Sequence, residues 1–229
     1  MKHSGRARKA AFKLILLTLI AGAVLWGLLW LGSVVTAFLL TIAVPVLLGV
    51  WVLFCVFTLY FFRDPTAAVP PGANQVLSPA HGKIDVVDKA SEFEVMGGEC
   101  HRISIFLSVI DVHVQNAPVT GKIAFYKYTV GEFMNAVRSE CADHNENVLL
   151  GFEATEPCGL KMAIRLIAGV IARRIVPFVK LGDEVVKGER ISLIQFGSRA
   201  NIYLPLNATV KVKVGDRAVG GETVLATYE

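Results

Sequence analysis

The feature that most limits how this chain can fold is a run of 49 residues, Leu14 to Phe62, without a single Asp, Glu, Lys, Arg or His. The hydrocarbon core of a bilayer is roughly 30 Å thick, and a helix crosses it with about 20 apolar residues. The run is therefore long enough for two crossings. We expect a transmembrane helical hairpin over residues 14–62, with its turn at Gly32-Ser33 or at Pro45.

Two other interpretations of this run stay open. A cleaved signal peptide is disfavoured, because the run is far longer than the apolar core of a signal peptide and no small-residue cleavage site interrupts it. A single long crossing with an interfacial stub also fits the length.

Charge predicts the orientation. Positive residues flanking a membrane segment stay on the cytoplasmic side. Arg63 follows the run, and five basic residues precede it: Lys2, Arg6, Arg8, Lys9 and Lys13. A hairpin returns the chain to the side where it began, so we expect the tail (1–13) and residues 63–229 on the cytoplasmic face of the cell (inner) membrane. An odd number of crossings would place residues 63–229 outside.

The distribution of charge also argues against a nucleic-acid-binding protein. All 19 acidic residues and 18 of the 23 basic residues follow Phe62, so the C-terminal part is close to neutral. The basic tail suits anionic lipid headgroups instead. No metal site is expected, because none of the four cysteines (Cys55, Cys100, Cys141 and Cys158) forms a CxxC pair.

Residues 63–229 are predicted to form one mainly β domain with few helices. Pro70, Pro71 and Gly72 end a linker over residues 63–74. Short alternating or β-branched segments follow, separated by Gly, Pro or Asn; they are Val76–Pro79, Gly82–Val87, Glu92–Val95, Arg102–Leu107, His113–Ala117 and Gly121–Tyr128. A helix is expected near Glu132–Glu140, and Lys161–Arg173 reads as a strand with a following turn.

The C-terminal part contains an internal repeat. Val179–Glu189 (VKLGDEVVKGE) matches Val212–Glu222 (VKVGDRAVGGE) at an offset of 33 residues. Gly-Asp and Gly-Glu supply tight turns around a short strand, a pattern typical of barrel-sandwich domains such as biotinyl and lipoyl carriers. A carrier would present a lysine between the copies. This chain has Gly197-Ser198 there, which argues against a swinging arm.

A Gly-Ser bond in a tight turn can cleave itself. The serine hydroxyl attacks the preceding carbonyl, and glycine leaves the approach open and permits unusual backbone angles. The amide becomes an ester, and β-elimination followed by hydrolysis leaves a pyruvoyl group. Such a group forms a Schiff base with a substrate amine and withdraws electrons for decarboxylation. Alone, the pair is a weak signal, since Gly32-Ser33 is also present.

The sequence around this pair resembles the processing site of the short bacterial and archaeal phosphatidylserine decarboxylases. The resemblance rests first on Phe196–Arg199 and Ile202–Pro205. Further family-like segments occur in order along the chain: Phe61–Pro65, Ser78–Lys83, Phe106–Val114, Ala117–Val119, Asn145–Glu153 and Ile167–Ile175. It extends from about Tyr60 to the C-terminus.

The resemblance implies cleavage between Gly197 and Ser198. The products would be a β chain (1–197) and an α chain (198–229), with the pyruvoyl cofactor made from Ser198. It further implies decarboxylation of phosphatidylserine, or a close relative, to the ethanolamine lipid and CO2. The expected partners are the phospholipid substrate in the membrane and the enzyme's own two chains. Homo-oligomerisation and the diacyl or ether nature of the lipid stay open.

The resemblance also assigns acid–base work to a histidine at the position of His113. Asp111 lies two residues earlier on the same strand face and is a candidate to orient the imidazole. Three arginines are candidates to contact the lipid phosphate: Arg63, Arg173 and Arg199.

One position departs from the family pattern. Its SPADGK segment carries an aspartate of the self-cleavage relay, whereas this chain has His81. Three interpretations follow. Asp85, Asp88 or Asp111 supplies the missing charge; His81 itself acts as a base; or processing is slow or lost. The third would leave an unprocessed, non-catalytic membrane-anchored homologue that binds lipid or a partner.

Overall fold

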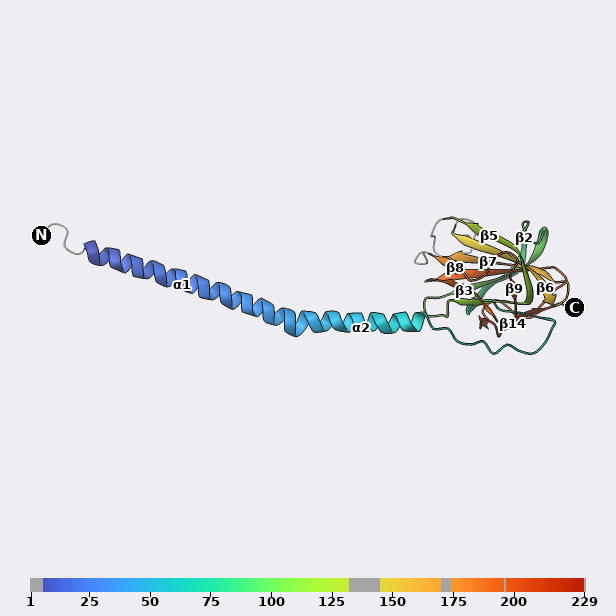
Figure 1. The fold of residues 1–229 in the computed structure, drawn as a ribbon, viewed down its shortest axis with the longest axis horizontal. Coiled ribbons are helices and arrows are strands. Elements are labelled where there is room, and N and C mark those ends of the chain that lie inside the picture. The colour runs from blue at the N-terminus through green and yellow to red at the C-terminus, as the bar shows by residue number, and fades with distance from the viewer. Residues whose placement is uncertain (1–5, 132–144, 170–173, 196, 229) are drawn as a thin grey trace. The chain divides into compact units, whose positions relative to one another are not determined.

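The computed structural model describes residues 6–131, 145–169, 174–195 and 197–228, and it divides into two units, Met1–Thr58 and Leu59–Glu229. The first unit is helical (Figure 1). Helix α1 (Arg6–Phe38) continues through a π-helical turn (Leu39–Ala43) into α2 (Val44–Phe61), whose last residues belong to the second unit.

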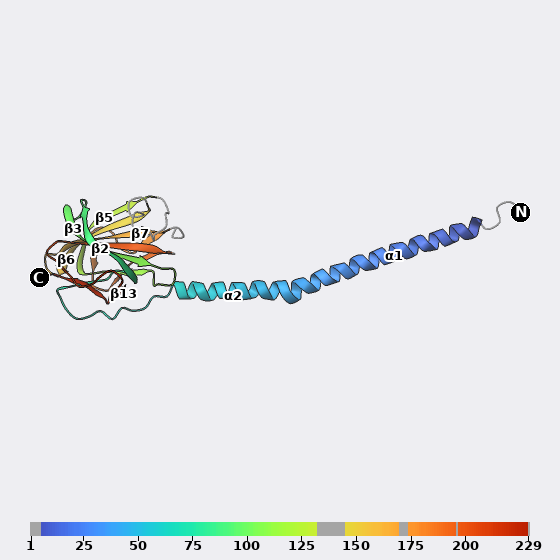
Figure 2. The same ribbon diagram turned by 180° about the vertical axis from the view of Figure 1, so that it is seen from behind.

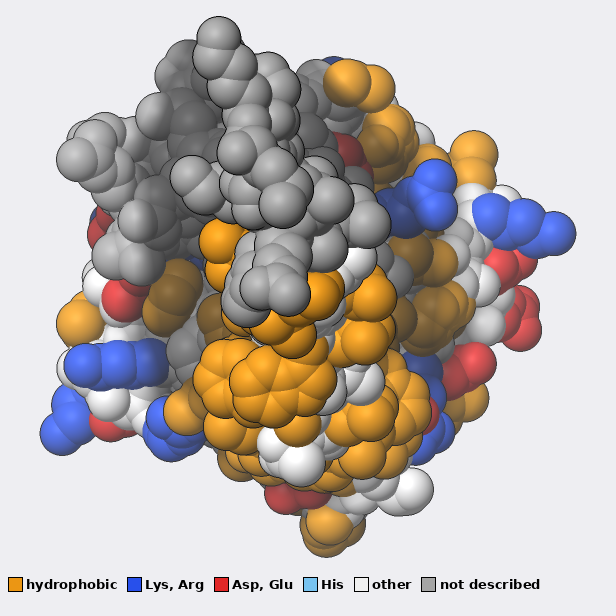
Figure 3. All heavy atoms as spheres, turned by 90° about the vertical axis from the view of Figure 1, so that its left-hand side faces the viewer, with side chains coloured by type: hydrophobic (Ala, Val, Ile, Leu, Met, Phe, Trp, Pro, Cys, Tyr) orange, Lys and Arg blue, Asp and Glu red, His pale blue; other side chains and the backbone are white. Residues whose placement is uncertain are grey.

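The helical segment is apolar on every side. Its Ile15–Phe61 stretch has a mean hydropathy of 2.7, and Figure 3, which looks along it, shows mostly hydrophobic side chains. Forty-seven residues of helix measure about 70 Å, more than twice a bilayer core. The helix runs straight through Gly32-Ser33, so the predicted hairpin is not confirmed. The backbone is irregular at Leu39–Ala43, just before Pro45.

The second unit is mainly β, as predicted (Figures 1 and 2). An antiparallel sheet has the order β13-β2-β3-β11-β7-β6-β5-β9, and two smaller sheets have the orders β1-β14-β12 and β4-β10-β8. The strands are β1 (Gln75–Leu77), β2 (Gly82–Glu92), β3 (Gly98–Leu107), β4 (Val114–Asn116), β5 (Thr120–Thr129), β6 (Asn147–Glu156), β7 (Lys161–Ala168), β8 (Ile175–Pro177), β9 (Glu184–Val185), β10 (Arg190–Ile194), β11 (Ser198–Leu204), β12 (Thr209–Val210), β13 (Arg217–Ala218) and β14 (Val224–Thr227).

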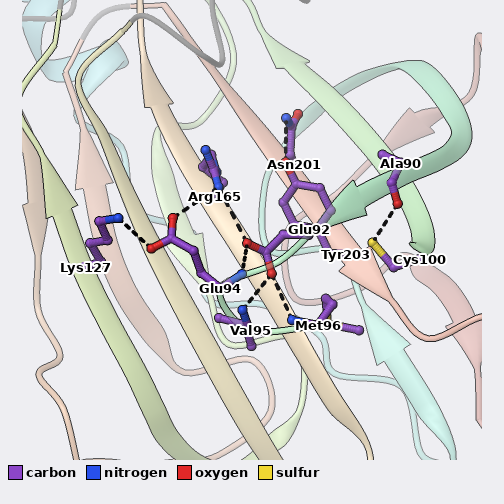
Figure 4. A network of polar contacts seen from close by, with 10 residues as sticks. All are labelled: Ala90, Glu92, Glu94, Val95, Met96, Cys100, Lys127, Arg165, Asn201 and Tyr203. Carbon is purple, nitrogen blue, oxygen red and sulfur yellow. Dashed lines mark hydrogen bonds and ion pairs between the residues drawn. The ribbon is translucent and has the colours of Figure 1, made fainter. Parts of the chain in front are cut away.

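One predicted strand is wrong. Glu92 ends β2 and residues 93–97 form the turn to β3, because the buried Glu92 carboxylate accepts hydrogen bonds from the backbone N–H groups of Glu94, Val95 and Met96 at 2.8–3.1 Å (Figure 4). The alternating sequence pattern did not reveal that the Glu92 side chain closes a hairpin. The helix expected at Glu132–Glu140, and residues 170–173, lie outside the described residues.

The internal repeat is confirmed as architecture. Its two short strands, β9 and β13, lie at opposite edges of the large sheet. Gly182 and Asp183 exchange backbone hydrogen bonds with Ile123 of β5, and the equivalent Gly215 and Asp216 make the same pair with Ile84 of β2. The two copies therefore close the sheet in the same way at each end.

The faces of β11 have different surroundings. Ala200, Ile202 and Leu204 face the main hydrophobic core. The alternate residues Asn201 and Tyr203 face the other side, where the turn between β2 and β3 folds over the sheet (Figure 4). The strand that carries the predicted processing site is thus buried on both faces.

We predict that Glu92→Ala lowers the free energy of unfolding by about 2–3 kcal/mol, because three backbone donors of a partly buried turn lose their buried acceptor. Thermal or urea unfolding of the detergent-solubilised protein would measure the loss. Glu94→Ala is the matched control: its carboxylate pairs with Lys127 on the surface, and the change should cost less than about 1 kcal/mol. Equal effects of the two changes would refute this role of Glu92.

Candidate active site

Ser198 is the first residue of β11, opposite Leu107 of β3 and Ala168 of β7. It is fully buried, and among the described residues its hydroxyl has no hydrogen-bond partner. Buried polar side-chain atoms are nearly always hydrogen-bonded, because leaving one unpaired costs free energy. Gln75 Oε1 and Arg165 Nε are likewise unpaired among the described residues, but Ser198 is the one that follows the Gly197 carbonyl.

Both backbone groups of Gly197 are held. Its N–H donates to Nε2 of His113 at 3.0 Å, and its carbonyl oxygen accepts from the Gly169 N–H at 3.1 Å. Its φ of +62° lies in the left-handed region that favours glycine. The carbonyl that precedes Ser198 is thus already aligned with a donor that can stabilise negative charge on its oxygen.

His113 is fully buried, and its hydrogen bonds define its tautomer. Nδ1 lies 2.9 Å from the main-chain oxygen of Asp111, so Nδ1 carries the hydrogen. Nε2 is then the acceptor, in agreement with the N–H that Gly197 donates to it. Burial lowers the pKa of His113 below 6.5, although Asp111 opposes the shift. The ring also lies 4.4 Å from the ring of Phe61. His113 is therefore a neutral base at pH 7.

Asp111 orients His113 through its backbone and not through its side chain. Its buried carboxylate accepts hydrogen bonds from the N–H and hydroxyl of Ser108, at 2.9 and 2.7 Å, and from Arg217. These bonds fix the turn that presents the Asp111 carbonyl to the imidazole. Sequence reasoning named Asp111 but gave no role in the site to Ser108, Gly169 or Arg217, although Ser108 and Gly169 lie in family-like segments and Arg217 lies in the internal repeat.

His81 lies near this centre without bonding to it. Its ring packs against Gly220: a Cβ added to this glycine would lie 3.1 Å from Nε2 of His81 and 2.9 Å from Oδ1 of Asn116. Burial lowers the pKa of His81, while Glu222 and Asp111 act to raise it. Its charge would in turn lower the pKa of His113. Among the described residues no hydrogen bond joins His81 to His113 or Ser198.

The other predicted carboxylates are elsewhere. Asp85 forms a bidentate ion pair with Arg199 at 2.6 and 2.8 Å, and Asp88 pairs with Arg102. Of the three candidates, Asp111 is the one that the fold brings to His113.

The three arginines predicted to contact the lipid phosphate have different surroundings. Arg199 is buried against a carboxylate, and Arg173 lies outside the described residues. Arg63 donates to the carbonyl oxygens of Tyr60 and Ile110, at the end of α2.

Comparison with known proteins gives a family for this arrangement. A family model described as phosphatidylserine decarboxylase matches residues 54–226. The chain belongs to the phosphatidylserine decarboxylase family. Phosphatidylserine decarboxylase proenzymes from Desulfotalea psychrophila and Geobacter metallireducens are 43% and 41% identical to it, over 79% and 90% of this chain and 83% and 91% of theirs. The one from Citrifermentans bemidjiense is 45% identical over 74% of this chain and 76% of its own.

We predict that His113 titrates below the ordinary histidine value of 6.5, because burial disfavours its charged form. Histidine NMR spectra of a Ser198→Ala precursor would measure this. Asp111→Asn removes a negative charge that supports the imidazolium, so the titration should move lower still. A pKa above 6.5 in the precursor would contradict the assignment of a neutral base.

Proposed function

We propose that this chain is a self-processing, pyruvoyl-dependent decarboxylase of phosphatidylserine that releases phosphatidylethanolamine and CO2. The observation that carries the proposal is the Gly197-Ser198 peptide, with a buried unpaired hydroxyl and a neutral imidazole bonded to the adjoining N–H. Membership of the family supports the decarboxylase activity, and relatives carry the name proenzyme.

Self-cleavage begins with transfer of the Ser198 hydroxyl proton to Nε2 of His113. For this, His113 exchanges its hydrogen bond with the Gly197 N–H for one with the hydroxyl. The Ser198 oxygen attacks the Gly197 carbonyl carbon, and the resulting oxyanion faces the Gly169 N–H. The C–N bond breaks as the departing amine takes the proton back from His113, and an ester remains.

The ester then eliminates. Loss of the Ser198 α-proton breaks the ester C–O bond, which leaves Gly197 as a carboxylate and residue 198 as dehydroalanine. Its imine tautomer takes up one water and releases ammonia, so that residue 198 becomes a pyruvoyl group. The three atoms that position this chemistry belong to His113, Gly169 and Asp111.

The pyruvoyl group, once formed, binds the substrate amine and acts as the electron sink for loss of CO2. The residues around it fit this use, because its position is buried and follows Gly197, whose N–H contacts the His113 imidazole. His113 returns a proton to the substrate carbon after CO2 has left. The strands on each side of residue 198 limit access of water to that carbon.

The catalytic unit includes the last residues of α2. We assign residues 14–62 to the membrane as a hairpin of two crossings, with its turn at the irregular segment before Pro45, and residues 63–229 to the cytoplasmic side. Arg63 stacks on Tyr60 at 4.0 Å and bonds the Ile110 carbonyl at 2.7 Å. This contact ties the turn that positions His113 to the last residues of α2.

Nothing in the described residues favours the unprocessed alternative, although His81 leaves His113 without a carboxylate partner. A carboxylate at position 81 would stabilise the imidazolium that forms during hydroxyl attack. The present site relies on the Asp111 carbonyl and on the charge of Asp111.

We predict that Ser198→Ala abolishes both cleavage and decarboxylation, because the variant has no hydroxyl oxygen to attack the Gly197 carbonyl and cannot form the ester whose elimination leads to the pyruvoyl group. Denaturing gels and CO2 release from phosphatidylserine vesicles would measure the two. Ser91→Ala, at an exposed serine of β2, is the control and should leave both intact. Decarboxylation by the Ser198→Ala variant would exclude the pyruvoyl mechanism.

We predict that His81→Asp speeds self-cleavage and moves its acidic limb to higher pH. The rate requires neutral His113 and falls as pH drops through its pKa, which an added carboxylate raises. Cleavage of freshly synthesised protein across a pH series would show the shift. A processing-dead variant would mean instead that the imidazole of His81 takes part in the reaction.

A further inference from the structure

We propose that Arg199, bound to the Asp85 carboxylate and to the Ser104 hydroxyl, forms with them a clamp that keeps residue 198 in position after the chain has been cut. The inference rests on the proposed self-cleavage and deepens it. It concerns positioning residues, since Arg199 and Ser198 point to opposite faces of β11.

The clamp is buried at its centre. Arg199 is 1% exposed, and its guanidinium makes two parallel hydrogen bonds to the Asp85 carboxylate at 2.8 and 2.6 Å. A third bond, of 2.5 Å, goes to the hydroxyl of Ser104. A bidentate pair fixes the angle as well as the distance between its partners. Arg199 can therefore move little along or across the sheet.

A β-bulge makes the pair possible. The register between β2 and β3 shifts between Ile84 and Val86, so that Asp85 is the extra residue. Bulges redirect a side chain in this way. Asp85 reaches across β3 to β11, and Ser104 lies between them, donating to the Asn201 side chain at 2.7 Å. The clamp thus joins three neighbouring strands through side chains alone.

Cleavage changes what holds residue 198. In the precursor, the peptide bond links Ser198 to Gly197, which is itself held by His113 and Gly169. After cleavage, residue 198 begins the α chain and has no N–H of its own. Chain ends fray unless they are tied down. The first side chain that can prevent fraying is that of Arg199, and Asp85 and Ser104 lie on the β chain.

The clamp should therefore matter more after cleavage than before it. We expect Asp85→Asn to be cleaved, but to lower kcat roughly 10- to 100-fold with little change in KM, because a displaced reacting group costs rate. We also expect it to lower the melting temperature of the cleaved enzyme more than that of the Ser198→Ala precursor carrying the same change.

The chain offers a matched control in Asp88→Asn. Asp88 of β2 pairs with Arg102 of the neighbouring strand β3, but on the surface, with side chains 41% and 27% exposed. This variant should leave kcat and both melting temperatures nearly unchanged. Ser104→Ala removes one hydrogen bond of the clamp and leaves the ion pair. It should therefore lower kcat and the melting temperature of the cleaved enzyme in the same way as Asp85→Asn, but by less, and it tests the clamp if Asp85→Asn folds poorly.

Wild-type protein that stays a single chain would overturn the proposed function itself. With cleaved wild-type protein in hand, equal losses of melting temperature in precursor and cleaved enzyme, together with an unchanged kcat, would overturn the clamp alone.

Discussion

The site depends on one hydrogen bond, from Nδ1–H of His113 to the main-chain carbonyl of Asp111. A carbonyl can only accept, so this bond places the hydrogen on Nδ1 and leaves Nε2 as a base. Burial keeps the ring neutral. The carbonyl is itself fixed, because the Asp111 carboxylate holds Ser108 and Arg217. Without this turn, the imidazole would have neither a defined tautomer nor a defined direction.

Successive residues of β11 have different proposed roles on opposite faces of the strand. Ser198 faces inward, toward the base and the donor for the oxyanion. Arg199 points to the opposite face of the strand, where it is also buried and pairs with Asp85 across β3. Both faces of the strand are buried, so Ser198, which we propose as the processing residue, lies within the sheet and not on a loop. A cut at position 197 then leaves the new end held by a strand that is already paired on both sides.

The sequence predicted the mainly β fold, the repeat, and the positions of Ser198 and His113, because these have periodic or motif signals. It did not predict Gly169, Ser108 or Arg217, which reach the site through the folded backbone. Asp85 looked like a relay candidate, since nothing in a strand pattern reveals a bulge that turns it toward Arg199. The segment at Glu92 read as a strand because a hairpin closed by a buried carboxylate keeps the same alternation.

The most direct test is the intact mass of the purified, denatured protein. The account predicts two chains, residues 1–197 and 198–229, with the smaller one beginning in a blocked pyruvoyl group. A single species of 24.8 kDa would contradict it, because the buried hydroxyl of Ser198 would then have no reaction to perform.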